Sequence, residues 1–167
     1  AAVAPLHNRR FERAVVVAHS MGGLVAKQYV LDNTPDKIDK LIFVGTPHLG
    51  SPKSAKMLLF GDHLVKVLLS YLNPGEMKYL AQNMASVYEL LPSSSYFTQI
   101  GRYIYDLTNS QSFDYQGTKQ YLADTGRNTV LLQTADRFQN SSMYNFSVGD
   151  LNTYKIVGCD SETLGKI

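Results

Sequence analysis

The segment from Arg13 to Gly23, with the sequence RAVVVAHSMGG, constrains the fold more than any other part of the chain. Its apolar run at 14–18 predicts a buried parallel strand, because strands covered on both faces are continuously apolar rather than alternating. A helical pattern begins directly after Ser20 and continues over 21–32. The segment therefore predicts a strand, a sharp turn with Ser20 at its apex, and a helix.

Small residues surround Ser20 in this turn, namely Ala18, Gly22 and Gly23. A strand and a helix that meet at such a turn pass close to each other, so the neighbouring side chains must be small. The turn would hold Ser20 in a strained backbone conformation above the C-terminal edge of a parallel sheet. The first turn of the helix directs free N–H groups and the positive end of its dipole to the same place. Ser20 is therefore predicted to be a nucleophile.

Two further strands are predicted. Residues 40–45, KLIFVG, form a second apolar run, and the helix between the two runs predicts a right-handed crossover and parallel neighbours. The loop at 46–52 then leaves the sheet at the edge that carries Ser20, so we expect it to form a wall of the active site. Residues 154–158, YKIVG, predict a third strand after a long excursion.

The excursion is predicted to be mostly helical, with segments at 53–72, 75–91, 118–123 and 128–144 and a stop at Pro92 and the serines that follow it. The segment at 53–72 has an unusually wide apolar face. In the earlier helix over 21–32, the packed face is predicted from Leu24, Val25, Tyr29 and Leu31, which leaves Lys27, Gln28 and Asp32 for solvent.

Composition narrows the class of protein. The chain has 167 residues, of which 44% are hydrophobic and 18% are charged, and this is typical of a globular domain. A net charge of +2 without a basic cluster gives no indication of a nucleic-acid partner. The single cysteine excludes an internal disulfide and a cysteine-based metal site, and leaves the compartment open. We expect no metal, no cofactor and no transmembrane helix.

The motif Ala18-His19-Ser20-Met21-Gly22 resembles the G-x-S-x-G nucleophile elbow of the α/β-hydrolases, with alanine at the first glycine position. Together with the stretches at 41–52, 89–94 and 154–167, it resembles the lipase branch of that superfamily, and most closely the lecithin:cholesterol acyltransferase-like group. The resemblance implies part of an α/β-hydrolase parallel sheet with a large helical cap or lid. Residues 1–52 would then be hydrolase core, 53–149 the cap, and 150–167 the return strand.

The resemblance implies Ser20 as the nucleophile and the Met21 backbone N–H as one donor of the oxyanion hole, with Ala18, His19, Gly22 and Gly23 completing the elbow. A second donor would lie before Ala1. Leu64 and Leu68 of the 53–72 segment would line an acyl pocket, although an apolar helical stripe of this kind equally fits core packing. His48 would lie at the same crevice.

The base and the acid are less well defined. His48 lies in the loop that is expected to leave the sheet at the edge that carries Ser20. The catalytic histidine of this fold, however, follows the last strand, which is not in this sequence. Asp160 follows the third strand and is one candidate for the acid; in the acyltransferase-like group the acid comes later. We therefore expect the 167 residues to be the middle of a longer enzyme.

Two classes of function remain open. The first is serine-dependent hydrolysis or transfer of an acyl group from a lipid-like ester through an acyl-enzyme on Ser20, with transient contact with a membrane or lipid surface. The alternative is a non-catalytic lipid- or protein-binding domain on the same scaffold. In either case the strand at 14–18 has an edge without charge or proline, which favours self-association through that edge.

Overall fold

A computed structural model describes residues 12–61, 73–139, 143, 146–147, 149–159 and 163–167. The chain divides into two compact units, which are described separately. The sheet unit comprises Ala1–Thr46 and Phe146–Gly158, and the helical unit comprises Pro47–Asn145 and Cys159–Ile167. The assignment of 53–149 as a cap stays a prediction.

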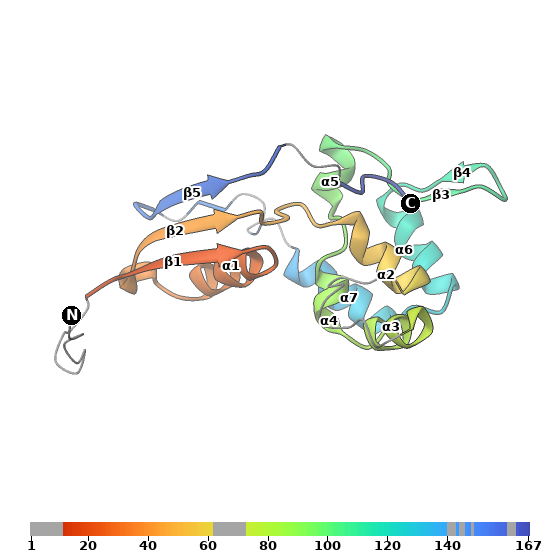
Figure 1. The fold of residues 1–167 in the computed structure, drawn as a ribbon, viewed down its shortest axis with the longest axis horizontal. Helices are drawn as coiled ribbons and strands as arrows, with labels where there is room; N and C mark the ends of the chain where they lie inside the picture. Colours follow the sequence, from red (N-terminus) through yellow and green to blue (C-terminus); the bar gives the residue numbers. More distant parts are fainter. Residues whose placement is uncertain (1–11, 62–72, 140–142, 144–145, 148, 160–162) are drawn as a thin grey trace. The chain divides into compact units, whose positions relative to one another are not determined.

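The sheet unit contains a three-stranded parallel sheet in the order β1-β2-β5 (Figure 1). Its elements are β1 (Ala14–His19), α1 (Gly22–Asp32), a 3₁₀ turn (Pro35–Lys37), β2 (Ile38–Val44) and β5 (Asn152–Ile156). Val17 pairs with Ile42, which in turn pairs with Tyr154. The predicted α/β class, the three strands and the parallel pairing of the first two are confirmed.

One face of this sheet is packed. Ala18 of β1 and Leu41 and Phe43 of β2 lie on the face that α1 covers, together with Val30 of the helix. The ring of Phe146 meets Phe43 edge-on, with 6.1 Å between ring centroids. This small core fixes the direction in which β1 enters the turn at Ser20.

The opposite face of the sheet is open in the described part of the chain. Val15 and Val17 are 53% and 64% exposed, and Tyr154 and Ile156 of β5 are 50% and 56% exposed. The prediction that 14–18 is buried on both faces is therefore wrong here. Successive residues of a strand point to opposite faces, and α1 covers one of them.

The packed face of α1 also differs from the prediction. The buried residues are Gly23, Leu24, Lys27 and Val30, whereas Val25 and Tyr29 are exposed. Gly23 lies close to the Thr46 side chain, and this contact sets the rotation of the helix about its axis. Lys27 follows on the same side one turn later. Its aliphatic stem is buried, and its ammonium group lies 5.3 Å from the centre of the Phe146 ring.

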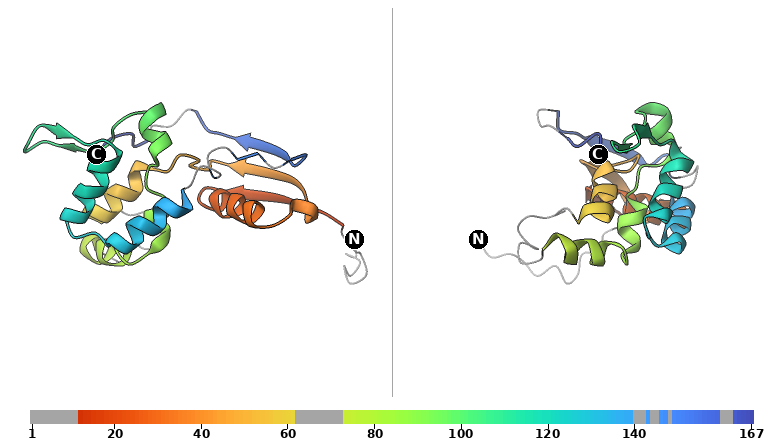
Figure 2. Two further views of the ribbon diagram at one scale, coloured as in Figure 1. Left: turned by 180° about the vertical axis from the view of Figure 1, so that it is seen from behind. Right: turned by 90° about the vertical axis from the view of Figure 1, so that its right-hand side faces the viewer.

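The helical unit contains six helices and a two-stranded hairpin among its described residues (Figure 2). These are α2 (Pro52–Phe60), α3 (Pro74–Ala81), α4 (Ala85–Glu89), α5 (Ser94–Gln99), β3 (Tyr105–Asp106), β4 (Gln111–Ser112), α6 (Tyr115–Asp124) and α7 (Thr129–Phe138). The two strands are antiparallel and were not predicted.

The first helix of this unit is shorter than predicted. The apolar pattern at 53–72 predicts one helix, but α2 ends at Phe60 because Gly61 adopts a left-handed conformation with φ of 74°. A β-carbon at Gly61 would lie 1.7 Å from the carbonyl oxygen of Pro74, so the chain passes too closely for any other residue. Residues 62–72, with Leu64 and Leu68, lie outside the described residues.

The other helical predictions hold in part. The segment at 75–91 is two helices, α3 and α4, and the serines after Pro92 begin α5 rather than ending a helix, since the Ser93 hydroxyl accepts the Tyr96 N–H at 3.3 Å. The segment at 118–123 belongs to the longer α6, capped by Asp114. The segment at 128–144 forms α7, capped by Asn128, and the helix ends at Phe138.

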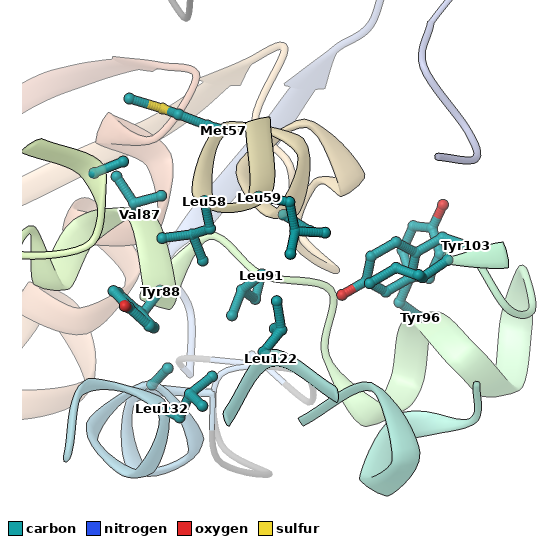
Figure 3. Close-up of a cluster of buried hydrophobic side chains, with 14 of the residues drawn as sticks. Met57, Leu58, Leu59, Val87, Tyr88, Leu91, Tyr96, Tyr103, Leu122 and Leu132 are labelled. Atoms are coloured by element: carbon teal, nitrogen blue, oxygen red, sulfur yellow. The ribbon is translucent and has the colours of Figure 1, made fainter. Parts of the chain in front are cut away.

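The helical unit closes a core of its own. Figure 3 shows Leu91 between the leucines of α2 and Leu122 of α6, with Tyr96 and Tyr103 side by side. Arg127 is buried, and its guanidinium group donates to the carbonyl oxygens of Leu58 at 2.8 Å and Thr125 at 2.7 Å. These two hydrogen bonds offset part of the cost of burying the cation, while its Nε is buried without a partner among the described residues.

Candidate active site at the first strand–helix turn

Ser20 sits between β1 and α1 in the conformation that the sequence predicts. Its φ is 53°, which is unusual for a residue with a side chain, and the residue is exposed. Its N–H donates to the Val44 carbonyl at 2.9 Å, and its carbonyl accepts the Gly23 N–H at 3.0 Å. The first hydrogen bond ties the strained turn to the end of β2 and the second closes it onto the start of α1, so the backbone of Ser20 is fixed at the end of the sheet.

The need for a small residue is sharpest at Gly23. A β-carbon there would lie 2.0 Å from the Thr46 hydroxyl oxygen, whereas one at Gly22 would meet nothing within 4 Å. Ala18, the last strand residue on the packed face, is buried. Of the predicted elbow residues, Gly23 is therefore the one that the contact between α1 and the end of β2 requires.

Met21 precedes the first helical residue and is half exposed, and α1 has no side-chain cap. The N–H groups of a first helical turn have no partner within the helix. In α1 the Gly23 and Leu24 N–H groups donate to the Ser20 and Met21 carbonyls, at 3.0 and 2.9 Å, and the Met21 N–H comes before them, directly after Ser20. An N–H at this end of a helix stabilises negative charge, which is the property needed in an oxyanion hole.

The positions of the remaining predicted site residues relative to Ser20 stay predictions, except for His19 next to it in β1. His19 is exposed on the same open face of the sheet as Val15 and Val17. His48 is half-buried in the helical unit, so its predicted closeness to Ser20 stays a prediction. Leu64, Leu68 and Asp160 lie outside the described residues.

The loop predicted to form an active-site wall is held in place by the stretch at 90–93. The Ser51 N–H donates to the Leu90 carbonyl at 2.8 Å, and the Ser93 N–H donates to the Leu49 carbonyl at 3.0 Å. The Ser93 hydroxyl donates to the same Leu49 carbonyl at 2.9 Å. Gly50 has φ of 92°, and a β-carbon there would lie 2.3 Å from the Leu91 carbonyl oxygen. Two motifs that are distant in sequence thus form one rigid joint.

Two features near the turn were missed in the sequence. The Thr46 hydroxyl oxygen is buried against Gly23 and has no hydrogen-bond partner among the described residues. Burial, and to a smaller extent the positive charge of Lys155, lowers the pKa of the Lys27 amine to about 8. No sequence motif marks either feature, because each depends on which side of α1 packs on the sheet.

The described residues show no metal site and no membrane-spanning helix. No cluster of His, Cys, Asp or Glu there has the arrangement of metal ligands. Likewise, none of the helices described is long and apolar enough to cross a membrane. Cys159 is exposed and is not in a disulfide.

Comparisons with known proteins extend this picture. The family model for lecithin:cholesterol acyltransferase matches residues 2–164. Among solved structures, the chain is similar to one in the crystal structure of the Tle4–Tli4 complex, with a TM-score of 0.64 and 18% sequence identity. That similarity covers 91% of this chain and 37% of the other. A comparison with curated protein sequences gave no match. The predicted α/β-hydrolase fold is confirmed.

Proposed function

We propose that this chain, which belongs to the lecithin:cholesterol acyltransferase family, carries the nucleophile Ser20 of an acyl-ester hydrolase or acyltransferase. The single observation that supports the role of Ser20 is its left-handed backbone conformation between a parallel strand and an uncapped helix start. This geometry exposes the hydroxyl at the point toward which the first helical turn directs its N–H groups.

In the proposed reaction the Ser20 Oγ attacks the carbonyl carbon of a lipid-like ester, and a general base takes the hydroxyl proton. The carbonyl oxygen becomes an oxyanion, to which the Met21 N–H donates. When the carbon–oxygen bond of the ester breaks, the leaving alkoxide takes the proton back from the base as an alcohol. Water or a second alcohol then attacks the acyl-enzyme, which makes the enzyme a hydrolase or a transferase respectively.

The base, the acid and the second oxyanion donor are assigned to the longer protein. This chain spans 37% of the length of its relative in the Tle4–Tli4 complex. His48 and Asp160 are the candidates within the chain, and the catalytic histidine expected for the fold follows a later strand. The isolated chain would then retain at most about 10³- to 10⁴-fold acceleration over water, as serine hydrolases do after loss of a triad member.

The decisive experiment is labelling of the full-length protein with a fluorophosphonate probe, followed by mass spectrometry of its peptides. The probe reacts with an activated serine, so we expect modification at Ser20 and its loss in Ser20→Ala. Ser51, which is held in the joint with Leu90, serves as the control, and Ser51→Ala should still be labelled at Ser20. Labelling at another serine would show that the nucleophile is misassigned. Absence of labelling together with lipid binding would favour a non-catalytic binding domain.

The acyl pocket is proposed separately, from the apolar pattern of Leu64 and Leu68. In the full-length protein, Leu64→Asp or Leu68→Asp should raise KM for long-chain esters far more than for acetate esters, because a pocket for the chain contributes nothing to a short substrate. Equal effects on both substrates would indicate a role in core packing instead.

A further inference from the structure

A groove of about 460 Å³ lies beside the β3–β4 hairpin of the helical unit. Its floor is formed by Tyr103 and Ile104, which are buried, and its walls include Arg102, Ser112 and Lys166. None of these residues belongs to the strand–helix turn at Ser20. The groove is therefore a feature of the helical unit alone.

The walls of the groove are fixed by hydrogen bonds. The Arg102 guanidinium donates to the carbonyl and the hydroxyl oxygens of Ser112, both at 3.1 Å, which holds it against β4. The Ile167 N–H donates to the Tyr103 carbonyl at 2.7 Å, and the Tyr105 N–H donates to the Ile167 carbonyl at 2.9 Å. The end of the chain thus pairs beside the start of the hairpin and brings Lys166 to the groove (Figure 1).

The charge of the groove is positive. Arg102 and Lys166 line it, and none of its described lining residues is acidic. The adjacent Asp106 is occupied within the hairpin turn, because its two carboxylate oxygens accept the Thr108 N–H and the Asn109 side-chain amide, both at 2.8 Å. These hydrogen bonds, first that from the Asn109 side chain, also lower the pKa of Asp106, so it stays in the turn as a carboxylate.

Apolar side chains flank the two cations. Leu107 at the hairpin turn is 83% exposed, Ile100 is 63% exposed and Tyr105 is 49% exposed. A site for a small soluble anion has no use for large apolar side chains in water beside its cations. A lipid surface matches both features, since anionic headgroups attract the cations and the acyl boundary accepts the apolar side chains.

We propose that this groove and the hairpin form a docking site for the anionic headgroups of a phospholipid surface, with Arg102 and Lys166 contacting the headgroups and Leu107 entering the acyl boundary. This site goes beyond the chemistry proposed at Ser20, because docking requires no turnover. It would hold the helical unit at the surface where an ester substrate resides.

The test uses the full-length protein with Ser20→Ala, and measures its cosedimentation with vesicles of phosphatidylcholine with and without phosphatidylserine. We expect binding that rises with phosphatidylserine. Each basic residue near an anionic surface contributes roughly fivefold in affinity, so Arg102→Gln with Lys166→Gln should weaken binding by about 25-fold. Leu107→Ser should weaken binding further without changing the charge.

Matched controls separate the site from net charge and from misfolding. Lys78→Gln with Arg137→Gln removes the same charge from α3 and α7 and should leave vesicle binding nearly intact. Arg102→Lys keeps the charge and should retain most of the binding even if its contact with Ser112 is weakened. Equal losses in the two double variants would overturn the proposal, and so would binding that is insensitive to phosphatidylserine. Competition by inorganic phosphate that abolishes binding at constant ionic strength would assign the groove to a free anion instead.

Discussion

The two units of the chain differ in how completely they bury their apolar side chains. The helical unit encloses Leu58, Tyr88 and Leu122 without measurable exposure, whereas the sheet unit leaves Val17 and Ile156 more than half exposed. The sheet unit is no less apolar in sequence than the helical unit. The difference shows that the helical unit supplies its own partners, while the sheet unit has partners for one face.

The contrast extends to the start of the helices. In the helical unit α3, α5, α6 and α7 begin with a side chain that accepts a backbone N–H, from Asn73, Ser93, Asp114 and Asn128 respectively, whereas α2 and α4 have no such cap. In the sheet unit α1 begins without one. A capping side chain accepts the second or third N–H of a helix. In α1 these N–H groups, from Gly23 and Leu24, donate instead to the Ser20 and Met21 carbonyls. The start of α1 is thus closed by the backbone of the Ser20 turn rather than by a side chain.

The largest effect should come from the core of the helical unit. Leu122→Ala removes a fully buried side chain and should lower the free energy of unfolding by about 2–5 kcal/mol, measured by urea denaturation. Val130→Ala, on the exposed side of α7, is the control and should change it by less than about 0.5 kcal/mol. Similar losses for the two variants would mean that this core does not form independently.

A pair of adjacent glycines tests the turn in the sheet unit. Gly23→Ala places a β-carbon against the Thr46 hydroxyl and should cost about 1–3 kcal/mol of stability, because overpacking displaces the helix from the sheet. Gly22→Ala meets nothing within 4 Å and should be neutral or slightly stabilising. Thermal unfolding of both variants gives the comparison. If Gly22→Ala is the more damaging of the two, α1 lies at another rotation.

Lys27 supplies a test that depends on pH. Its folded pKa of about 8 lies below the unfolded value of 10.5, so between these values the unfolded state binds the extra proton and stability rises with pH. Below pH 8 the buried ammonium destabilises the fold fully, and Lys27→Met should stabilise it there by about 1–2 kcal/mol, a range that allows for screening by solvent. The advantage should disappear above pH 10.5. A constant difference across this range would show that desolvation of the amine is not its cause.

The sequence was sufficient for the turn at Ser20 because its requirements are local. A strand, a small residue and a helix within ten positions determine the backbone conformation, and the positive φ follows from them. The parallel pairing of β1 with β2 could also be predicted, since a crossover helix between two strands permits few other arrangements of the strands.

Which side chains of β1 and α1 are buried could not be predicted from the same residues. Val15 and Val17 have the composition of a covered strand, but no described element covers them. Lys27 is buried because Gly23 fixes the rotation of α1 on the sheet, and hydropathy alone assigns a lysine to solvent. The break at Gly61 was missed because the apolar stripe continues through it, although the close Pro74 carbonyl excludes a side chain there.

The smallest expected effect concerns the caps and restates the contrast between the units at the level of single side chains. Asn73 accepts the Glu76 N–H at 3.0 Å, and the Glu76 carboxylate accepts the Asn73 N–H at 2.8 Å. Asn73→Ala breaks this reciprocal pair and should cost about 1 kcal/mol. Met21→Ala, at the equivalent position of α1, should cost less, because no capping hydrogen bond is lost. Urea denaturation of the two variants decides the matter: if Met21→Ala costs as much as Asn73→Ala, the start of α1 depends on the Met21 side chain for its stability, although that side chain makes no capping hydrogen bond.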